Sequence, residues 1–436
     1  RTIREYAYPN AALLLGNVGE VNAKDIEKDP YYVPGDNSGR TGIEGSYEQV
    51  LRGEKGVEIL LRDAHGRIKG HYEDGKYDSP AVSGKNLKLS IDIDLQAYGE
   101  KLMKNKLGGI VMIEPETGEV LCMVSSPTYD PSLLVGRIRG KNYKKLQEDP
   151  LKPLFNRPLM AQYPPGSTFK PTQGLIFLQE GVITPETRFT CAHGYTYRGG
   201  KPACHGHPSP LPLVGALATS CNSFFPWGLH YLLDDRSRYP SVQQAFDVWK
   251  DYMVSMGYGY KLGIDLPGEA ATIMHQPDKI RGYIPNSKVY DKIYRKRWNS
   301  STIISIAIGQ GEILATPLQI CNLAATVANR GYFITPHVVK EIQDTVLDTL
   351  YTKRRYTKVD PKYYTYIAEG MRGAVMGTAY GATCRGANLP DIEVCGKTGT
   401  AENPHGKDHS IFMGFAPYQQ PKVAIAVFVE NAGFGA

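Results

Sequence analysis

The sequence predicts an α+β protein of two domains, a small β-rich domain followed by a larger domain of strands and helices. Three observations support this class. The chain has 436 residues, more than one core usually fills. Short apolar runs with a period of two lie at both ends of the larger domain, and mostly helical sequence lies between them. We therefore expect one antiparallel sheet built from both ends, with a helical region inserted.

Residues 1–85 are rich in glycine, tyrosine and charge, and are expected to form the small domain. Segments 56–61 and 66–70 predict a β-hairpin, because the turn-forming sequence Asp63-Ala64-His65-Gly66 separates them. Segment 74–86 contains two glycines and a proline, which indicates a linker.

Residues 86–436 are expected to form the larger domain, which opens with a strand at 87–94 and a helix at 95–106. A second hairpin is predicted next, followed by internal helices and two late strands. These predicted elements are strands at 109–113, 120–124, 411–415 and 423–429, and helices at 172–180 and 318–329.

Composition excludes several classes of function. The net charge is +6, but basic residues occur in short, scattered clusters such as Lys353-Arg354-Arg355, so no nucleic-acid partner is expected. No run approaches the roughly 18 apolar residues of a membrane-spanning helix. Because the chain begins at Arg1 without a methionine, we expect a fragment that lacks an upstream anchor or signal.

The segment Ser167–Lys170 (STFK) provides a nucleophile and a base on one helical turn. A helix is expected from Ser167 to Gly181, and residues three apart lie on the same helix face, so the Lys170 amine can reach the Ser167 hydroxyl. A serine needs such a base, and a lysine can serve when burial lowers its pKa. The alternative interpretation is a helix cap beside a surface lysine.

The segment Ser220–Asn222 (SCN) follows in the chain. Its serine can pass a proton between Lys170 and a leaving amine, and its asparagine can hold Lys170 or a substrate amide. Taken alone, this tripeptide would be interpreted as a simple helix cap.

The segment Lys397–Thr400 (KTGT) predicts a cationic strand along which an extended peptide can pair. The alternative is a tight turn with a surface lysine. We expect the backbone N–H groups of Ser167 and Thr400 to stabilise an oxyanion. Together the motifs predict serine acyl transfer at a peptide carboxylate without a cofactor. The predicted catalytic residues are Ser167, Lys170, Ser220, Asn222 and Lys397, and the predicted substrate-binding residues are Thr398, Gly399 and Thr400.

Soft metal ligands are concentrated around the second motif. Cys191, Cys204 and Cys221 lie in one 31-residue span with three histidines, which is the ligand density expected of structural zinc. The chosen ligands are Cys191, Cys204, His207 and Cys221. A metal behind Cys221 would brace Ser220 and Asn222. The alternatives are a Cys191–Cys204 disulfide or free thiols.

The three motifs are those of penicillin-binding proteins and class A β-lactamases. Around them, nearly the whole chain resembles a class B penicillin-binding protein of the penicillin-binding protein 2 type. Segments 39–48 and 51–56 are similar to the pedestal domain of that family, and segments 308–312, 316–319 and 415–417 to its transpeptidase domain. The resemblance implies a truncated, dimerisation-like pedestal at 1–85. It also implies a transpeptidase/β-lactamase-like domain at 86–436, with a five-stranded antiparallel sheet flanked by helices and a helical subdomain.

The resemblance further implies a D,D-transpeptidase of cell elongation. Ser167 would attack the D-Ala-D-Ala stem peptide, release D-Ala and pass the acyl group to an amine on a neighbouring peptidoglycan strand, and β-lactams would acylate the same serine. A bacterial inner-membrane anchor, a periplasmic catalytic domain, and a SEDS-type glycosyltransferase and elongation-complex proteins as partners are also implied. The chain departs from the family by lacking the anchor and the outer pedestal, and by stopping before the usual last helix.

Two other functions use parts of the same pattern. A D,D-carboxypeptidase or serine β-lactamase would hydrolyse the acyl-enzyme, although no separate glutamate motif for activating water is evident and the pedestal-like segment argues against a free-standing lactamase. A non-catalytic β-lactam sensor or scaffold would use the small domain at residues 1–85. The rate of deacylation separates the enzymes, and growth supported by a Ser167→Ala protein would favour the scaffold.

Overall fold

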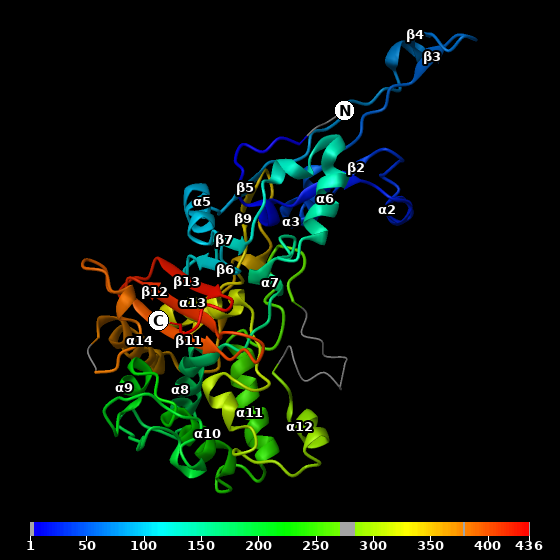
Figure 1. The fold of residues 1–436 in the computed structure, drawn as a ribbon. Helices are drawn as coiled ribbons and strands as arrows, with labels where there is room; N and C mark the ends of the chain where they lie inside the picture. The colour runs from blue at the N-terminus through cyan, green and yellow to red at the C-terminus, as the bar shows by residue number, and fades with distance from the viewer. Residues whose placement is uncertain (1–3, 271–283, 378–379, 436) are drawn as a thin grey trace.

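The computed structural model describes residues 4–270, 284–377 and 380–435. Residues 4–85 form an elongated N-terminal segment, and the remainder forms a larger body. Figure 1 shows the strands β3 and β4 at the far end of the N-terminal segment, and the helices α8 to α12 at the opposite end of the molecule.

The N-terminal segment contains two small antiparallel pairs of strands, β1 with β2 and β3 with β4. The predicted hairpin is confirmed, and Asp63 closes its turn by accepting hydrogen bonds from the backbone N–H groups of His65 and Arg67. The elements are α1 Ala12–Leu15, β1 Asn17–Glu20, α2 Ala23–Lys28, β2 Asn37–Thr41, α3 Gly42–Ser46, α4 Glu48–Leu51, β3 Leu60–Arg62 and β4 Ile68–His71.

The body is built on one antiparallel sheet of five strands in the order β11-β12-β13-β6-β7. Its strands come from both ends of the body, as the sequence predicts, and β11 lies at an edge. The strands are β6 Gly108–Ile113, β7 Val120–Ser126, β11 Cys395–Ala401, β12 His409–Ala416 and β13 Val423–Val429.

The strand predicted at 87–94 is shorter than expected. Only β5 (Leu87–Leu89) forms, and it pairs with β9 (Val339–Ile342) outside the five-stranded sheet. Asp92 ends the extended stretch because its carboxylate accepts hydrogen bonds from the N–H groups of Asp94 and Leu95. This cap starts α5 (Ile93–Leu102) before the predicted position.

Helices cover both faces of the sheet. On one face, α13 (Pro317–Ala328) packs on the central strands, and on the other face α5 packs on β7, while α14 (Pro361–Met376) packs on the edge strand β11. Thr316 and Gln319 start α13 with a reciprocal capping box. The further helices and short strands of the body are α6 Arg139–Glu148, α7 Arg157–Met160, β8 Tyr332–Phe333 and β10 Arg355–Tyr356.

The inserted helical region lies below the sheet in Figure 1. Its core is tightly packed: a Cβ added at Gly228 would lie 2.3 Å from the ring of Phe177, which is fully buried. The helices are α8 Lys170–Gln179, α9 Leu213–Ala218, α10 Phe224–Asp234, α11 Val242–Ser255 and α12 Ser287–Ile293. Short 3-10 helices lie at Tyr72–Gly75, Pro131–Leu134, Gly136–Ile138, Gly166–Phe169, Thr196–Arg198, Ile304–Ile308, Thr349–Tyr351 and Arg385–Ala387.

Polar contacts join the N-terminal segment to the body. The Tyr47 hydroxyl donates to Oδ2 of the buried Asp265 at 2.9 Å. Glu100 of α5 accepts from the backbone N–H of Ala11 at 2.8 Å, and Arg139 of α6 donates to Asn17 at 2.8 Å. Within the described part of the chain, no helix has both the length and the apolar character needed to cross a membrane.

Candidate active site

Ser167 lies in the 3-10 turn Gly166–Phe169 that runs directly into α8. Gly166 has a φ of +55°, and a Cβ there would lie 2.4 Å from the carbonyl oxygen of Thr400, so only glycine fits. The Ser167 side chain is half-buried, whereas the next three residues are buried. The turn therefore presents the predicted nucleophile beside β11.

The Lys170 amine is fully buried at the start of α8. Its Nζ donates to the Ser220 carbonyl oxygen at 2.7 Å, the Ser220 Oγ at 3.1 Å and the Asn222 Oδ1 at 2.6 Å. Among the described residues, the Ser167 hydroxyl makes no hydrogen bond. The first and second motifs thus meet through Lys170.

The Lys397 amine approaches Ser220 from the other side. It is also fully buried, and its Nζ donates to the Ser220 Oγ at 2.8 Å and to the Thr398 carbonyl oxygen at 3.0 Å. Ser220 has a left-handed backbone with a φ of +57°, which is uncommon for a residue with a side chain. One hydroxyl therefore contacts both lysines.

Burial controls the charge of the two amines. Burial, together with the positive charge of Lys397, lowers the pKa of Lys170 to about 7. Burial likewise lowers the pKa of Lys397 to about 8. Lys170 is consequently the amine that loses its proton first as the pH rises, as a general base requires.

The remaining predicted residues also lie around these side chains, and the site that they form between the Ser167 turn and β11 is referred to as the cleft. The Asn222 amide donates to the Ala203 carbonyl oxygen at 2.7 Å while its oxygen holds Lys170. A Cβ at Gly399 would lie 2.9 Å from the Pro165 carbonyl oxygen, so this glycine permits the close approach of β11 to the Ser167 turn. The Thr400 carbonyl accepts from the Gln310 side chain at 2.8 Å. Gln310 is not part of the three motifs.

The four predicted metal ligands form one cluster: the ligand atoms of Cys191, Cys204, His207 and Cys221 all lie within 4.8 Å of one another. The Nδ1 of His207 lies 2.7 Å from the Pro208 carbonyl oxygen, which favours a proton there and leaves Nε2 facing the Cys204 sulfur at 3.2 Å.

Backbone groups favour a thiolate at the deepest of these cysteines. The Cys221 sulfur accepts from the N–H groups of Ser223 and Phe224 at the start of α10. A hydrogen bond from Cys204 and these two N–H groups lower the pKa of Cys221 despite its burial. The Asn222 N–H donates to the Cys204 sulfur at 3.2 Å, so the cluster directly contacts the second motif.

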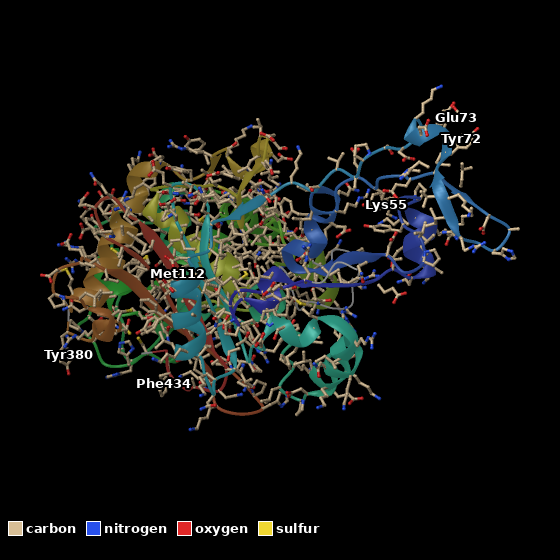
Figure 2. The ribbon with its side chains drawn as sticks, turned by 90° about the horizontal axis from the view of Figure 1, so that it is seen from above. Lys55, Tyr72, Glu73, Met112, Tyr380 and Phe434 are labelled. Atoms are coloured by element: carbon tan, nitrogen blue, oxygen red, sulfur yellow. The ribbon has the colours of Figure 1, made fainter. Side chains whose placement is uncertain are left out.

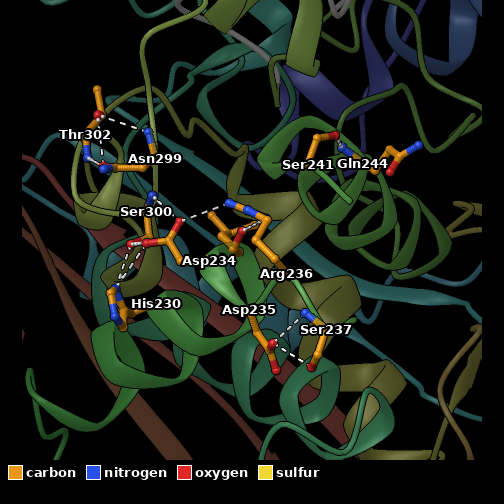
Figure 3. A network of polar contacts seen from close by, with 11 residues as sticks. His230, Asp234, Asp235, Arg236, Ser237, Ser241, Gln244, Asn299, Ser300 and Thr302 are labelled. Atoms are coloured by element: carbon orange, nitrogen blue, oxygen red, sulfur yellow. Dashed lines mark hydrogen bonds and ion pairs between the residues drawn. The ribbon is translucent and has the colours of Figure 1, made fainter. Parts of the chain in front are cut away.

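Figure 3 shows a serine–histidine–aspartate group, formed by Ser300, His230 and Asp234. His230 Nδ1 lies 2.9 Å from the Ser300 hydroxyl and 3.2 Å from the Asp234 carboxylate. In a catalytic triad the serine and the carboxylate contact opposite ring nitrogens. Here both contact the same nitrogen and Ser300 is fully buried, so the group braces the end of α10.

The model of the penicillin-binding protein transpeptidase domain matches residues 108–436, and that of the penicillin-binding protein dimerisation domain matches residues 1–89. The chain belongs to the penicillin-binding proteins. Within that family it is of class B, the penicillin-binding protein 2 type. The fold is the predicted one, a dimerisation domain and a transpeptidase domain with a five-stranded antiparallel sheet.

Individual relatives agree with this membership. The chain is 32% identical to the peptidoglycan D,D-transpeptidase MrdA of Acinetobacter baumannii over 98% of its own length and 63% of that relative. It is similar to penicillin-binding protein 2 of Pseudomonas aeruginosa, solved in complex with WCK 5153, with a TM-score of 0.80, 30% identity and coverage of 99% and 87%. It is also similar to penicillin-binding protein 2 of Helicobacter pylori in complex with MreC, with a TM-score of 0.78, 27% identity and coverage of 99% and 76%.

Proposed function

We propose that this penicillin-binding protein is a peptidoglycan D,D-transpeptidase of cell elongation that works through a Ser167 acyl-enzyme. One observation carries the proposal: a buried hydrogen-bonded chain, Lys170–Ser220–Lys397, begins at the residue that directly follows the turn of Ser167. Its members come from three distant parts of the sequence. The relatives of the MrdA type support the choice of D-Ala-D-Ala stem peptides as substrate.

In the acylation step, the Ser167 Oγ attacks the carbonyl carbon of the penultimate D-Ala and gives its proton to neutral Lys170. The N–H groups of Ser167 and Thr400 stabilise the resulting oxyanion. The peptide C–N bond then breaks, and the departing amine of the terminal D-Ala receives the proton from Lys170 through the Ser220 hydroxyl.

The other residues hold the reactants. Asn222 orients Lys170, and Lys397 with Thr398 and Thr400 provides a positive, hydrogen-bonding strand for the terminal carboxylate. Gly399 keeps that strand close to the nucleophile. An acceptor amine then attacks the ester carbonyl, and the C–O bond breaks to regenerate Ser167. β-Lactams would acylate the same oxygen.

Incubation with a fluorescent penicillin, followed by intact mass spectrometry over time, tests the proposal. We expect a stable one-to-one adduct in the unaltered protein and none in the Ser167→Ala variant. Absence of the adduct in folded protein would overturn acylation by this chain and favour a non-catalytic scaffold. Rapid loss of the adduct would favour a D,D-carboxypeptidase or β-lactamase.

We further propose that Cys191, Cys204, His207 and Cys221 hold a structural zinc ion. Three sulfurs and one imidazole nitrogen at mutual distances within 4.8 Å are close to the tetrahedral donor set that zinc prefers. The ion would fix the loop that carries Asn222 and would supply no step of the reaction. Metal analysis should find about one zinc per chain, lost in Cys204→Ser but kept in Cys384→Ser, a buried cysteine outside the cluster. Alkylatable thiols, or a Cys191–Cys204 disulfide in native protein, would contradict zinc.

The family also supports a cellular setting. We propose a boundary near residue 85 between the dimerisation domain (1–85) and the transpeptidase domain (86–436), with the catalytic domain periplasmic and anchored in the inner membrane. The H. pylori complex supports an MreC-type partner. The family resemblance supports a SEDS-type glycosyltransferase as a second partner. Cross-linking in cells, with a full-length version that carries this chain, should capture these proteins. Their absence from the cross-linked products would contradict the assignment.

A further inference from the structure

The backbone of Thr400 faces the cleft with both of its polar groups. Strand β11 is at the edge of the sheet, and in an antiparallel pair the N–H and C=O of one residue point to the same side. The Thr400 carbonyl points away from β12, since it accepts from Gln310 and since a Cβ at Gly166 would lie 2.4 Å from it. The Thr400 N–H therefore points toward the turn that carries Ser167.

Gly309 holds that same turn from the other side. Its carbonyl accepts from the Gly166 N–H at 2.9 Å. It has a φ of +71°, and a Cβ there would lie 2.2 Å from the Gly166 carbonyl oxygen. The neighbouring Gln310 is itself fixed, because its N–H donates to the Ser305 carbonyl oxygen at 3.1 Å. The dipeptide Gly309-Gln310 is thus an anchored piece of backbone.

This dipeptide contacts the carriers of both expected oxyanion donors. Gly309 binds the residue before Ser167, and Gln310 binds Thr400. We propose that Gln310 is a positioning residue that fixes the spacing between the N–H groups of Ser167 and Thr400. The inference rests on the proposed function of Ser167 and adds to it a group outside the three motifs.

The side-chain amide is well suited to this position. It reaches the carbonyl with a neutral N–H donor and adds no charge beside the buried amines of Lys170 and Lys397. An ionised carboxylate of the same shape would place an oxygen against the Thr400 oxygen and repel it. A protonated carboxylic acid would again offer a donor.

The test compares Gln310→Ala and Gln310→Glu with the unaltered protein. Loss of one oxyanion donor typically slows a reaction 10²- to 10³-fold, so displacement of a donor is expected to slow acylation by about 10- to 100-fold. Stopped-flow measurements with a penicillin should show this fall in the acylation rate constant, with the preceding dissociation constant nearly unchanged. The acylation rate constant of Gln310→Glu should approach that of the unaltered protein as the pH falls, because protonation turns the carboxylate into a hydrogen-bond donor.

Infrared spectra of the acyl-enzyme report on the donors directly. The ester carbonyl of the Gln310→Ala acyl-enzyme should absorb at higher frequency than that of the unaltered protein, because its hydrogen bonds are weaker. Gln319→Ala is the matched control. The Gln319 amide also donates to backbone carbonyls, those of Gly257 and Tyr260, but on α13. This control should leave the rate and the frequency unchanged.

Each result decides between the two proposals. If the unaltered folded protein forms no adduct, the function of Ser167 fails. If it does, and Gln310→Ala acylates at the same rate with the same carbonyl frequency, the positioning role is overturned while acylation stands. An equal fall in rate for Gln310→Ala and Gln319→Ala, without a frequency shift, would also overturn it, since the loss would then be general destabilisation.

Discussion

The β3–β4 hairpin region and the cleft differ in which side chains they bury. The hairpin region exposes apolar side chains, whereas the cleft buries ionisable ones. At the end of the N-terminal segment, Val57, Ile59, Leu61 and Ile68 are 52%, 41%, 48% and 58% exposed. In the cleft, the amines of Lys170 and Lys397 are 0% exposed. Figure 2 shows Tyr72 and Glu73 at the exposed end, far from Met112 in the sheet.

The difference follows from the size of the core beneath each region. The cleft lies on helices and a sheet whose large side chains are fully buried, and this burial offsets the cost of desolvating two amines. The β3–β4 hairpin has only two short strands and no such core. Substitutions in the cleft should therefore change chemistry, substitutions beneath it should change stability, and substitutions in the hairpin should change neither.

The largest expected effect is on the acylation rate in a Lys170→Met variant. Loss of the base should lower the penicillin acylation rate by 10²- to 10⁴-fold while the protein stays folded. In the unaltered protein the rate should rise as the pH passes about 7, because Lys170 acts in its neutral form. A variant that acylates normally would show that Lys170 is not the base.

Urea unfolding of the same variant sharpens the comparison. The pKa of Lys170 is about 7 in the folded protein and about 10.5 in an unfolded chain. Between these values the unfolded chain binds more protons, so this residue makes stability rise with pH. Between pH 7 and pH 9, the free energy of unfolding should increase less in Lys170→Met than in the unaltered protein. An equal increase in the two proteins would contradict the burial of this amine.

The next effect concerns the core beneath the cleft. Phe177→Ala should lower the free energy of unfolding by about 3–5 kcal/mol, because the ring is fully buried against Gly228. Tyr72→Ala removes an aromatic ring of similar size from the exposed end and serves as the control. Equal losses in the two variants, measured by denaturant unfolding, would remove the distinction between the regions.

A smaller effect is expected where the two regions join. Tyr47→Phe removes one hydrogen bond from Asp265, which still accepts from the N–H groups of Val338 and Val339. The free energy of unfolding should fall by about 1.5–3 kcal/mol, as for a hydrogen bond to a charged group. Tyr351→Phe is the matched control, because its hydroxyl makes only a 3.4 Å contact with the Gly263 carbonyl oxygen. No loss of thermal stability in Tyr47→Phe would mean that this contact contributes nothing to the junction.

The smallest effect is expected in the hairpin. Ile59→Ser and Leu61→Ser should change the free energy of unfolding by less than about 0.5 kcal/mol, because both side chains are already exposed to water. A loss above about 2 kcal/mol in the isolated protein would show that the hairpin packs against another part of the chain.

Local patterns predicted much of the fold. Apolar runs predict four strands of the sheet, the Lys397–Thr400 motif predicts the fifth, and the glycine after α8 marks the end of that helix. The strand at 87–94 was predicted too long because apolar alternation continues past Ser90, whereas the Asp92 side chain caps a helix there. Its pairing with β9 joins residues about 250 positions apart, which periodicity does not reveal.

The candidate site was predictable where residue types carry the chemistry. The three motifs and the four proposed metal ligands do converge, but only coordinates reveal that Ser220 contacts both lysines. Gln310 illustrates the limit most clearly. A glutamine has no characteristic reactivity, and its contact with Thr400 spans 90 residues. The similarity of segment 308–312 to the family does not indicate what its side chains touch.

The edge position of β11 has a consequence for solubility. An open edge strand invites pairing with another sheet and hence aggregation. In this protein the Ser167 turn and Gln310 overhang the edge at Thr400, and a charged side chain, Lys397, points inward from the same strand. The flat border of a second sheet would collide with the groups that contact this edge. The contacts that hold the Ser167 turn against this edge therefore also obstruct its pairing with a second sheet.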